Sequence, residues 1–216
     1  NQRNFGLEQG APRHSWVLHL DADEVVTPAF RDQLAELQPH ADVDAYRIPS
    51  KLMMNEYWLM YAGMYPTYQV RLGHRDRLRF TQVGHGQREI VPPSRIATFD
   101  EPYLHYNFSQ GLAAWLHKHV QYADDEARLL VAIREGQQVL RGSMSALDSM
   151  QRRRVLKQLA ARLPLVLRPA ARIFYVLVWR RGILDGRYGV LYALMLGVYE
   201  AMIAILAMDK SLRRNR

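Results

Sequence analysis

The chain has 216 residues, of which 49% are hydrophobic and 23% charged, so it can bury a sizeable core and is not a disordered tail. It contains no cysteine, which excludes disulfides and thiolate metal sites, so a metal here must bind oxygen or imidazole. The net charge of +8 is uneven: residues 1–150 carry 15 Lys and Arg against 18 Asp and Glu, whereas residues 151–216 carry 14 against three. Because the basic end is also apolar, it suits an anionic membrane surface better than a nucleic acid. We therefore expect a membrane surface as partner and no nucleic acid.

The first feature along the chain is a short apolar run, residues 15–20, that ends in the acidic segment Asp21-Ala22-Asp23-Glu24. The run predicts a buried strand with a loop at its carboxyl end. In an open α/β sheet ligands bind at that end, and an Asp-x-Asp pair offers the hard oxygen ligands that Mg²⁺ or Mn²⁺ prefers. An acidic surface turn that caps the next helix fits the same residues equally well.

The following hundred or so residues predict mixed α/β structure. Thr27 as N-cap and Pro28 in the first turn predict a helix over residues 29–37. Short β-like runs follow at residues 45–48, 68–72, 78–83 and 103–106. A proline-free stretch from Gly111 to about residue 140 has apolar residues at helical spacing and predicts one long helix.

The basic C-terminal end predicts helices that associate with a membrane. Residues 150–163 have the pattern of a basic amphipathic helix, and two apolar segments follow at residues 170–179 and 189–208. The second segment has the roughly 20 residues that a bilayer span needs, but Glu200 lies near its middle. We therefore expect these helices to lie in the membrane interface or to enter one leaflet, with a true span as the alternative.

Residues 16–24 resemble the metal-binding strand of family 2 glycosyltransferases, which have the GT-A fold. Further motifs in the same order resemble the lipopolysaccharide-core glucosyltransferase branch of that family. They are Gln2-Arg3-Asn4-Phe5-Gly6-Leu7, Val83-Gly84-His85-Gly86-Gln87-Arg88-Glu89, Leu104-His105-Tyr106 with Lys118 and Tyr122-Ala123, and Leu184-Asp185-Gly186 with Gly189. The acidic segment is the most specific of these motifs.

For the fold, the resemblance implies an α/β chain with two parts. Residues 1–145 would form a partial GT-A domain with a Rossmann-like mixed sheet, and residues 146–216 an α-helical membrane-associated region. Family members place a nucleotide-binding βαβ half before the acidic strand, whereas only about twenty residues precede Asp21 here. Unless another chain supplies that half, the resemblance implies a truncated transferase. About seventy to a hundred residues of βαβ pattern upstream of Asn1, the size of a small domain, would settle the family.

For the metal site, the resemblance implies that Asp23 coordinates Mg²⁺ or Mn²⁺, while Asp21 contacts the nucleotide ribose or the water shell of the metal. Glu24 would support the loop. His105 is a candidate imidazole ligand to the same ion, and a histidine hydrogen-bonded within a mixed sheet is the equal alternative.

An inverting transfer also needs a carboxylate that takes the proton from the acceptor hydroxyl. Glu89 is the first candidate, but three residues separate it from His85, where the family has an adjacent pair. Asp100 and Glu101 are therefore alternative candidates. Four basic residues are candidates for contacting the diphosphate or an anionic acceptor: Arg71, Arg75, Lys118 and His119.

Together with the basic C-terminal end, the resemblance therefore implies an inverting glycosyltransferase at the cytoplasmic face of the inner membrane. It would move a hexose from a nucleotide-sugar, UDP-linked, to a lipid-linked glycan or a lipopolysaccharide-core acceptor. One alternative is a haloacid-dehalogenase-type phosphatase with Asp21 as nucleophile and Asp23 as acid/base, although its second acidic pair would have to be Asp124-Asp125, inside the predicted long helix. The other alternative is a non-catalytic membrane scaffold.

Overall fold

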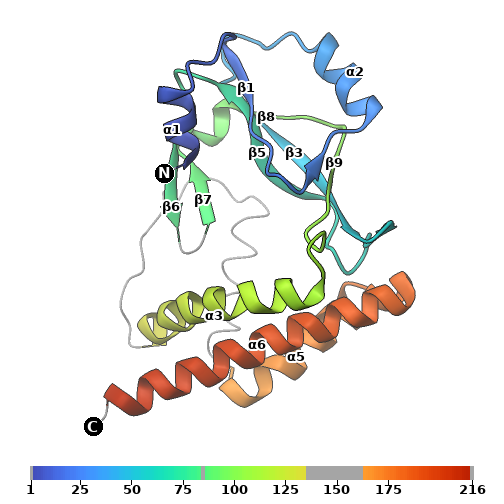
Figure 1. Ribbon diagram of the computed structural model, residues 1–216, viewed down its shortest axis with the longest axis vertical. Helices are drawn as coiled ribbons and strands as arrows, with labels where there is room; N and C mark the ends of the chain where they lie inside the picture. The colour runs from blue at the N-terminus through green and yellow to red at the C-terminus, as the bar shows by residue number, and fades with distance from the viewer. Residues whose placement is uncertain (1, 84–85, 135–162, 215–216) are drawn as a thin grey trace.

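The computed structural model describes residues 2–83, 86–134 and 163–214 (Figure 1). Three sequence-based expectations fall outside these ranges: the position of His85, most of the basic helix over residues 150–163, and the boundary between residues 145 and 146. Within the described ranges, a curled sheet with two flanking helices forms one part of the molecule, and a layer of helices forms the other (Figure 1).

The sheet is mixed, with the strand order β1-β5-β3-β9-β2. These strands are β1 (Trp16–Leu18), β5 (Thr67–His74), β3 (Ala45–Met54), β9 (Tyr103–His105) and β2 (Glu24–Val25). Strands β4 (Tyr57–Trp58) and β8 (Ile96–Thr98) also pair with β3, while β6 (Phe80–Val83) and β7 (Gly86–Glu89) form a separate hairpin. Strand β3 runs parallel to β8 and β9 and antiparallel to β4 and β5, so the predicted mixed α/β class is confirmed.

Helix α2 (Pro28–Glu36) covers one face of the sheet and begins where the sequence predicts it. The Thr27 hydroxyl accepts a hydrogen bond from the Phe30 backbone N–H at 3.1 Å, and Pro28 occupies the first turn. The buried ring of Phe30 packs on Phe99, with ring centroids 4.7 Å apart, in a cluster that includes Tyr46 on β3. This apolar contact holds α2 against the sheet.

Helix α1 (Gln2–Gln9) packs in a second cluster, on the other face of β3. Leu7 joins Ala45, Val70 and Phe80 there, and Ala45 and Tyr46 point to opposite faces because they are consecutive on one strand. The short η1 (Pro93–Arg95) leads into β8. Strand β3 is therefore covered by apolar side chains on both faces.

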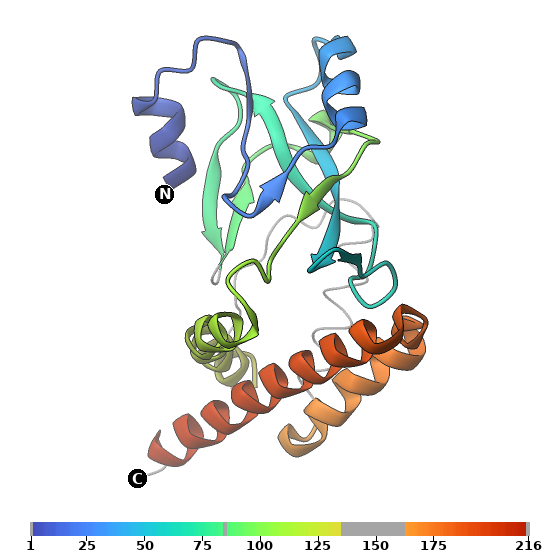
Figure 2. The same cartoon turned by 45° about the vertical axis from the view of Figure 1, so that its right-hand side comes forward.

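The helical layer lies at one end of the sheet (Figure 2). It consists of α3 (Leu112–Arg134), η2 (Leu165–Leu167), α5 (Arg168–Phe174), the π-helical turn η3 (Tyr175–Trp179), η4 (Gly182–Asp185) and α6 (Gly186–Arg214). Helix α3 crosses α6 through Ala127 and Ala207, whose small side chains allow close approach. The predicted long helix and both apolar segments are therefore helical within the described residues.

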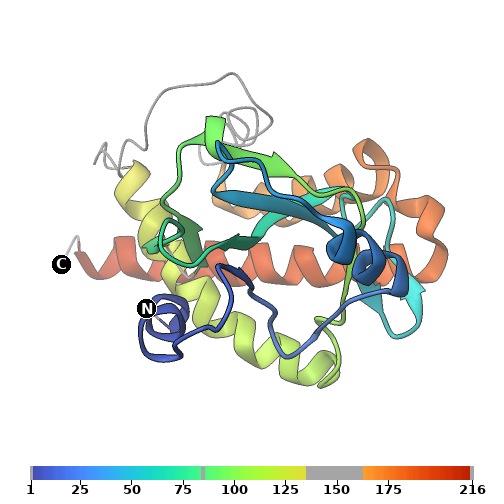
Figure 3. The same ribbon diagram turned by 90° about the horizontal axis from the view of Figure 1, so that it is seen from above.

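The carboxylate of Asp185 joins the helical layer to the sheet. Its Oδ2 atom accepts hydrogen bonds from the backbone N–H groups of Tyr61 and Ala62, at 3.0 and 2.7 Å. A Cβ atom on Gly189 would lie only 1.9 Å from the Gly182 carbonyl oxygen, so glycine is required there. The Leu184-Asp185-Gly186 motif thus has a clear structural role, and the view from above shows α6 running beneath the sheet (Figure 3).

Candidate functional site

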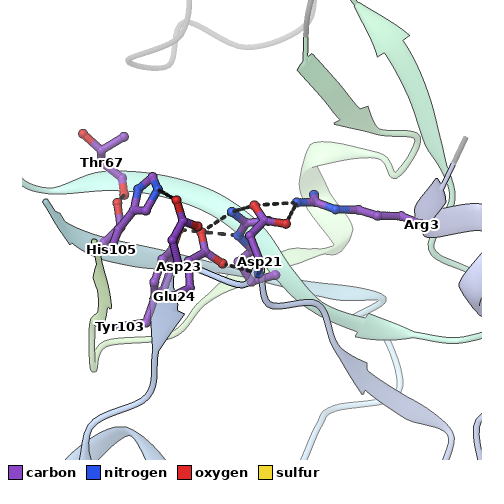
Figure 4. Close-up of polar contacts among 9 residues, drawn as sticks. Arg3, Asp21, Asp23, Glu24, Thr67, Tyr103 and His105 are labelled. Carbon is purple, nitrogen blue, oxygen red and sulfur yellow. Dashed lines mark hydrogen bonds and ion pairs between the residues drawn. The ribbon is translucent and has the colours of Figure 1, made fainter. Parts of the chain in front are cut away.

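The acidic segment forms a tight turn between β1 and β2. The strand predicted over residues 15–20 is shorter, Trp16–Leu18, and is partly buried where the sequence predicts a buried strand. The backbone N–H of Glu24 donates to the Asp21 carbonyl oxygen at 3.0 Å. The Glu24 side chain folds back and accepts from the Asp21 N–H, also at 3.0 Å. Glu24 therefore supports the turn from inside, while Asp21 and Asp23 occupy its outer side (Figure 4).

Arg71 reaches the turn from an irregularity in β5. Tyr46 pairs with Leu72 but Arg47 pairs with Val70, so Arg71 has no residue opposite it on β3. Such a bulge bends the strand and redirects a side chain. The guanidinium Nη2 donates to Asp21 Oδ2 at 2.8 Å and also to Glu24 Oε1.

The ion pair between Arg71 and Glu24 is fully buried, since the two side chains are 2% and 0% exposed. Arg71 Nε also donates to the hydroxyl of Tyr103 on β9, at 3.4 Å. The three groups link β5, β2 and β9 by polar contacts where these strands meet. Breaking one member leaves the others charged or polar in a dry environment, which makes the cluster rigid.

Asp21 is held from a second side by Arg3 of α1. Arg3 Nη2 lies 3.2 Å from Asp21 Oδ1. Partial burial acts to raise the pKa of Asp21, but the guanidinium groups of Arg71 and Arg3 outweigh burial and keep that pKa below its usual value. Asn4 fixes α1 in place by exchanging two hydrogen bonds with the backbone of Phe80, both 2.9 Å long. Asp21 is thus an ionised carboxylate with two protein partners.

Asp23 has a different environment and lies beside His105. The Tyr106 N–H donates to the Asp23 carbonyl oxygen at 2.8 Å, and Glu24 is paired with His105 across β2 and β9. This register brings His105 Nε2 to 3.5 Å from Asp23 Oδ2, with the side chains 23% and 30% exposed (Figure 4). Within the described ranges no group of three or more His, Asp or Glu side chains is placed so that it could hold a metal ion.

His19, on the loop just before the turn, is neutral. Burial, together with the positive charges of Arg3 and Arg71, lowers its pKa to about 4. Its Nε2 atom and the Nη1 atom of Arg71 are buried without a hydrogen-bond partner in the described part of the chain. A buried polar atom left without a partner costs about 1–3 kcal/mol, so these two atoms lower the stability of the site.

Of the three candidate bases, Glu89 is the one linked to this cluster. It lies on β7 opposite Phe80, whose ring contacts the His19 ring at a centroid distance of 5.2 Å and lies under the Arg3 guanidinium. Asp100 and Glu101 lie between β8 and β9, where the Glu101 N–H donates to the Gln33 side chain of α2. Neither carboxylate is bonded to the acidic turn in the residues described.

The remaining candidates are on other elements. Lys118 is on α3, 5.5 Å from the ring centroid of Tyr122, and His119 on the same helix bonds to the Trp115 carbonyl oxygen. Arg75 follows β5 and donates to the Pro12 carbonyl oxygen. The pair Asp124-Asp125 lies within α3, as the sequence predicts, and Asp124 is ion-paired with Lys210 of α6.

A pocket of about 240 Å³ lies between the β3–β4 turn and the segment that follows β9. Two of its lining residues are Tyr106, the residue after His105, and Phe108, which contacts Trp115 of α3 and Tyr192 of α6. Its lining consists of Met53, Asn55, Glu56, Tyr106, Phe108 and Ser109.

Sequence analysis missed three residues of the site: Arg3, His19 and Tyr103. Arg3 belongs to the upstream motif, but nothing in the motif indicates that it pairs with Asp21. His19 lies two residues before Asp21 and reads as part of an apolar strand, and Tyr103 reads as an ordinary core residue. Their roles depend on contacts between elements that are distant in the sequence.

Comparisons of this chain with protein-family models, with curated proteins and with solved structures give no match. The site must therefore be interpreted from its own geometry. That geometry has two halves: an internal half, where Arg71 and Glu24 are buried, and an accessible half, where Asp23 and His105 are partly exposed. The first half can hold the turn, and the second can meet a ligand.

Proposed function

We propose that this chain carries the catalytic site of an inverting, metal-dependent glycosyltransferase with a GT-A-type sheet. It would transfer a hexose from a UDP-linked nucleotide-sugar to a lipid-linked glycan or a lipopolysaccharide-core acceptor. The observation that carries the proposal is that the acids of the turn have different environments. Glu24 is buried in an ion pair with Arg71, whereas the Asp23 carboxylate is partly exposed beside His105.

Asp23 and His105 fit a divalent cation. A carboxylate oxygen and an imidazole nitrogen 3.5 Å apart can bind one ion after small side-chain adjustments, and both are partly exposed. Two protein ligands leave the other positions to diphosphate oxygens and water, which suits an ion that keeps several waters. Bound Mg²⁺ or Mn²⁺ would supply charge neutralisation for the departing diphosphate.

The other residues would orient the reactants and move the proton. Asp21 accepts from Arg3 and Arg71, so this carboxylate keeps a fixed direction in which a ribose hydroxyl can donate to it. We assign the base to Glu89, since it lies opposite Phe80 in the hairpin that contacts His19 and Arg3. Its carboxylate would take the proton of the acceptor hydroxyl as that oxygen attacks the anomeric carbon. Asp100 and Glu101 are less suited, since the Glu101 backbone is bonded to α2.

The location that suits this reaction is the cytoplasmic face of the inner membrane. Among the described residues, the segment Gly182–Arg214 alone is long and apolar enough to cross a bilayer, and 44% of its most apolar stretch is buried inside the protein. An apolar helix that is also part of the protein core favours a peripheral or monotopic attachment. A lining residue of the pocket, Phe108, contacts Trp115 of α3 and Tyr192 of α6, so an acceptor bound there would be close to the helices.

Manganese binding tests the proposal at the acidic turn. Calorimetric titration of Mn²⁺ in the presence of UDP should show binding that Asp23→Asn and His105→Gln each weaken at least about tenfold, because the first removes the negative charge of the carboxylate and the second removes the imidazole. Asp32→Asn is the matched control, since Asp32 is an exposed aspartate on α2 paired with Arg31. Equal affinity in all four proteins would contradict the proposal.

Product analysis distinguishes the alternatives. Sugar transfer from a UDP-hexose to a lipid-linked acceptor, abolished by Asp23→Asn and by Glu89→Gln, is the expected result. An acyl-phosphate on Asp21 would instead indicate the phosphatase. Binding of Mn²⁺ and UDP without any transfer would favour the non-catalytic scaffold. The phosphatase is disfavoured by position, because Asp124 and Asp125 lie within α3 and not at a strand end.

A further inference from the structure

Helix α6 has an exposed apolar stripe along most of its length. The stripe consists of Val190, Leu191, Leu194, Val198, Ile205 and Leu212. These positions are separated by one, three, four or seven residues and fall on one side of a helix. Exposed apolar side chains that recur at this spacing over more than five turns form a surface that is typical of an interaction site.

The other sides of α6 are already covered. Ile203 and Ala207 pack on α3, and the Lys210 ammonium lies 2.6 Å from an Asp124 carboxylate oxygen. Gly197 packs against α5, where an added Cβ would lie 2.6 Å from Ile173. Tyr192 belongs to the cluster that joins the helices to the sheet. The stripe is therefore on the side of α6 that these three contacts leave open.

The elements before α6 also expose apolar side chains. Their exposed apolar residues are Val166, Leu167, Phe174, Val178, Trp179, Ile183 and Leu184, and Trp179 is 77% exposed. A tryptophan is suited to the boundary between lipid and water, because its ring is apolar and its N–H is polar. We call the exposed apolar residues of η2, α5, η3 and η4, together with the α6 stripe, the outer face.

Charge indicates what covers the outer face. Residues 163–214 hold eight Lys and Arg against three acids. Each acid has an internal partner: Asp185 accepts from two backbone N–H groups, Glu200 lies 2.7 Å from Arg168, and Asp209 lies 2.9 Å from Arg213. The balance of the segment is +5, which complements anionic lipid headgroups and opposes the approach of a second copy of the same face.

We propose that the outer face docks on an anionic bilayer, with α5 and α6 lying in the plane of one leaflet. Helix α6 then crosses no membrane, although its length and composition would allow it, because α3, α5 and the sheet junction cover its other sides. The inference deepens the proposed function by giving the membrane attachment a defined surface. Its test uses lipid vesicles without donor or acceptor, so it can fail independently of sugar transfer.

Three isoleucines with nearly equal exposure provide the experiment. Ile183 and Ile205 on the outer face are 62% and 61% exposed, and Ile90, after β7, is 58% exposed. In sedimentation with phosphatidylglycerol vesicles, Ile183→Asn and Ile205→Asn should each weaken binding about tenfold, since each removes one buried apolar side chain from the bilayer. Ile90→Asn should bind like the parent chain, and binding to phosphatidylcholine vesicles should be weaker throughout.

Two further measurements decide the orientation and the occupant. With protein added from outside, protease should cut tags at both ends of the chain, because an in-plane α6 leaves both ends on one side. A C-terminal tag protected inside the vesicle would overturn the proposal in favour of a span. Equal binding of all three variants to the vesicles would overturn it as well. A dimer in light scattering that Ile205→Asn dissociates would also overturn it, because a second copy would then cover the outer face.

Discussion

The buried pair Arg71–Glu24 provides the sharpest prediction about how the site is held. Replacing Arg71 by Met keeps much of the side-chain volume and removes the guanidinium. Glu24, which has no exposed surface, would then keep one hydrogen bond, from the Asp21 N–H, and no counterion. The Tyr103 hydroxyl would lose the Arg71 Nε donor as well.

The expected cost follows from this geometry. Removing one partner of a buried ion pair costs about 3–5 kcal/mol, because the other charge stays buried without compensation. The partly exposed Asp21 adds at most about 1 kcal/mol. Adding Glu24→Gln to Arg71→Met removes the stranded charge, so the double variant should recover about 2 kcal/mol relative to Arg71→Met alone.

Urea unfolding followed by circular dichroism measures these free energies. Arg31→Met is the matched control, since Arg31 pairs with Asp32 on the exposed surface of α2 and should cost less than about 1 kcal/mol. If Arg71→Met cost no more than this control, or if Glu24→Gln added its own loss in the double variant, the buried pair would not hold the turn.

Three further predictions concern other contacts. The pKa of His19 is lowered to about 4, so between about pH 6.5 and 4 the unfolded chain binds this proton and the folded chain does not. The free energy of unfolding therefore falls on acidification. His19→Gln should remove about 1 kcal/mol of the loss between pH 7 and 5, measured by urea unfolding. Thr27→Ala removes the N-cap and should cost about 1 kcal/mol in thermal unfolding, whereas Thr27→Ser should not. Asp185→Ala leaves the N–H groups of Tyr61 and Ala62 without their acceptor and should cost about 2–4 kcal/mol, with faster amide exchange at both residues.

Each of these has an outcome that would contradict it. An identical pH slope in His19→Gln would mean that the imidazole is not kept neutral by burial and by Arg3 and Arg71. A Thr27→Ala protein as stable as the parent would mean that the cap is replaced by water. Slow exchange at Tyr61 in Asp185→Ala would mean that this loop is held by other contacts.

Local patterns along the chain were enough to predict most elements. Thr27-Pro28 predicted the start of α2, because an N-cap hydroxyl and a proline in the first turn affect only the backbone of the next few residues. Helical spacing of apolar residues predicted α3 and the apolar helices of the C-terminal end, and it holds for α3 as far as Arg134. The acidic turn itself was also evident, as an acidic segment that follows an apolar run.

Only the tertiary structure decided what the acids do. Arg71 meets Glu24 across 47 residues of chain, and Arg3 meets Asp21 across 18, through a bulge in β5 and the docking of α1. Glu200, which argued against a span, found its partner Arg168 on a neighbouring helix 32 residues away. Sequence spacing fixes the side of a helix or strand that a residue occupies, whereas the partner across the interface depends on register and packing between separate elements.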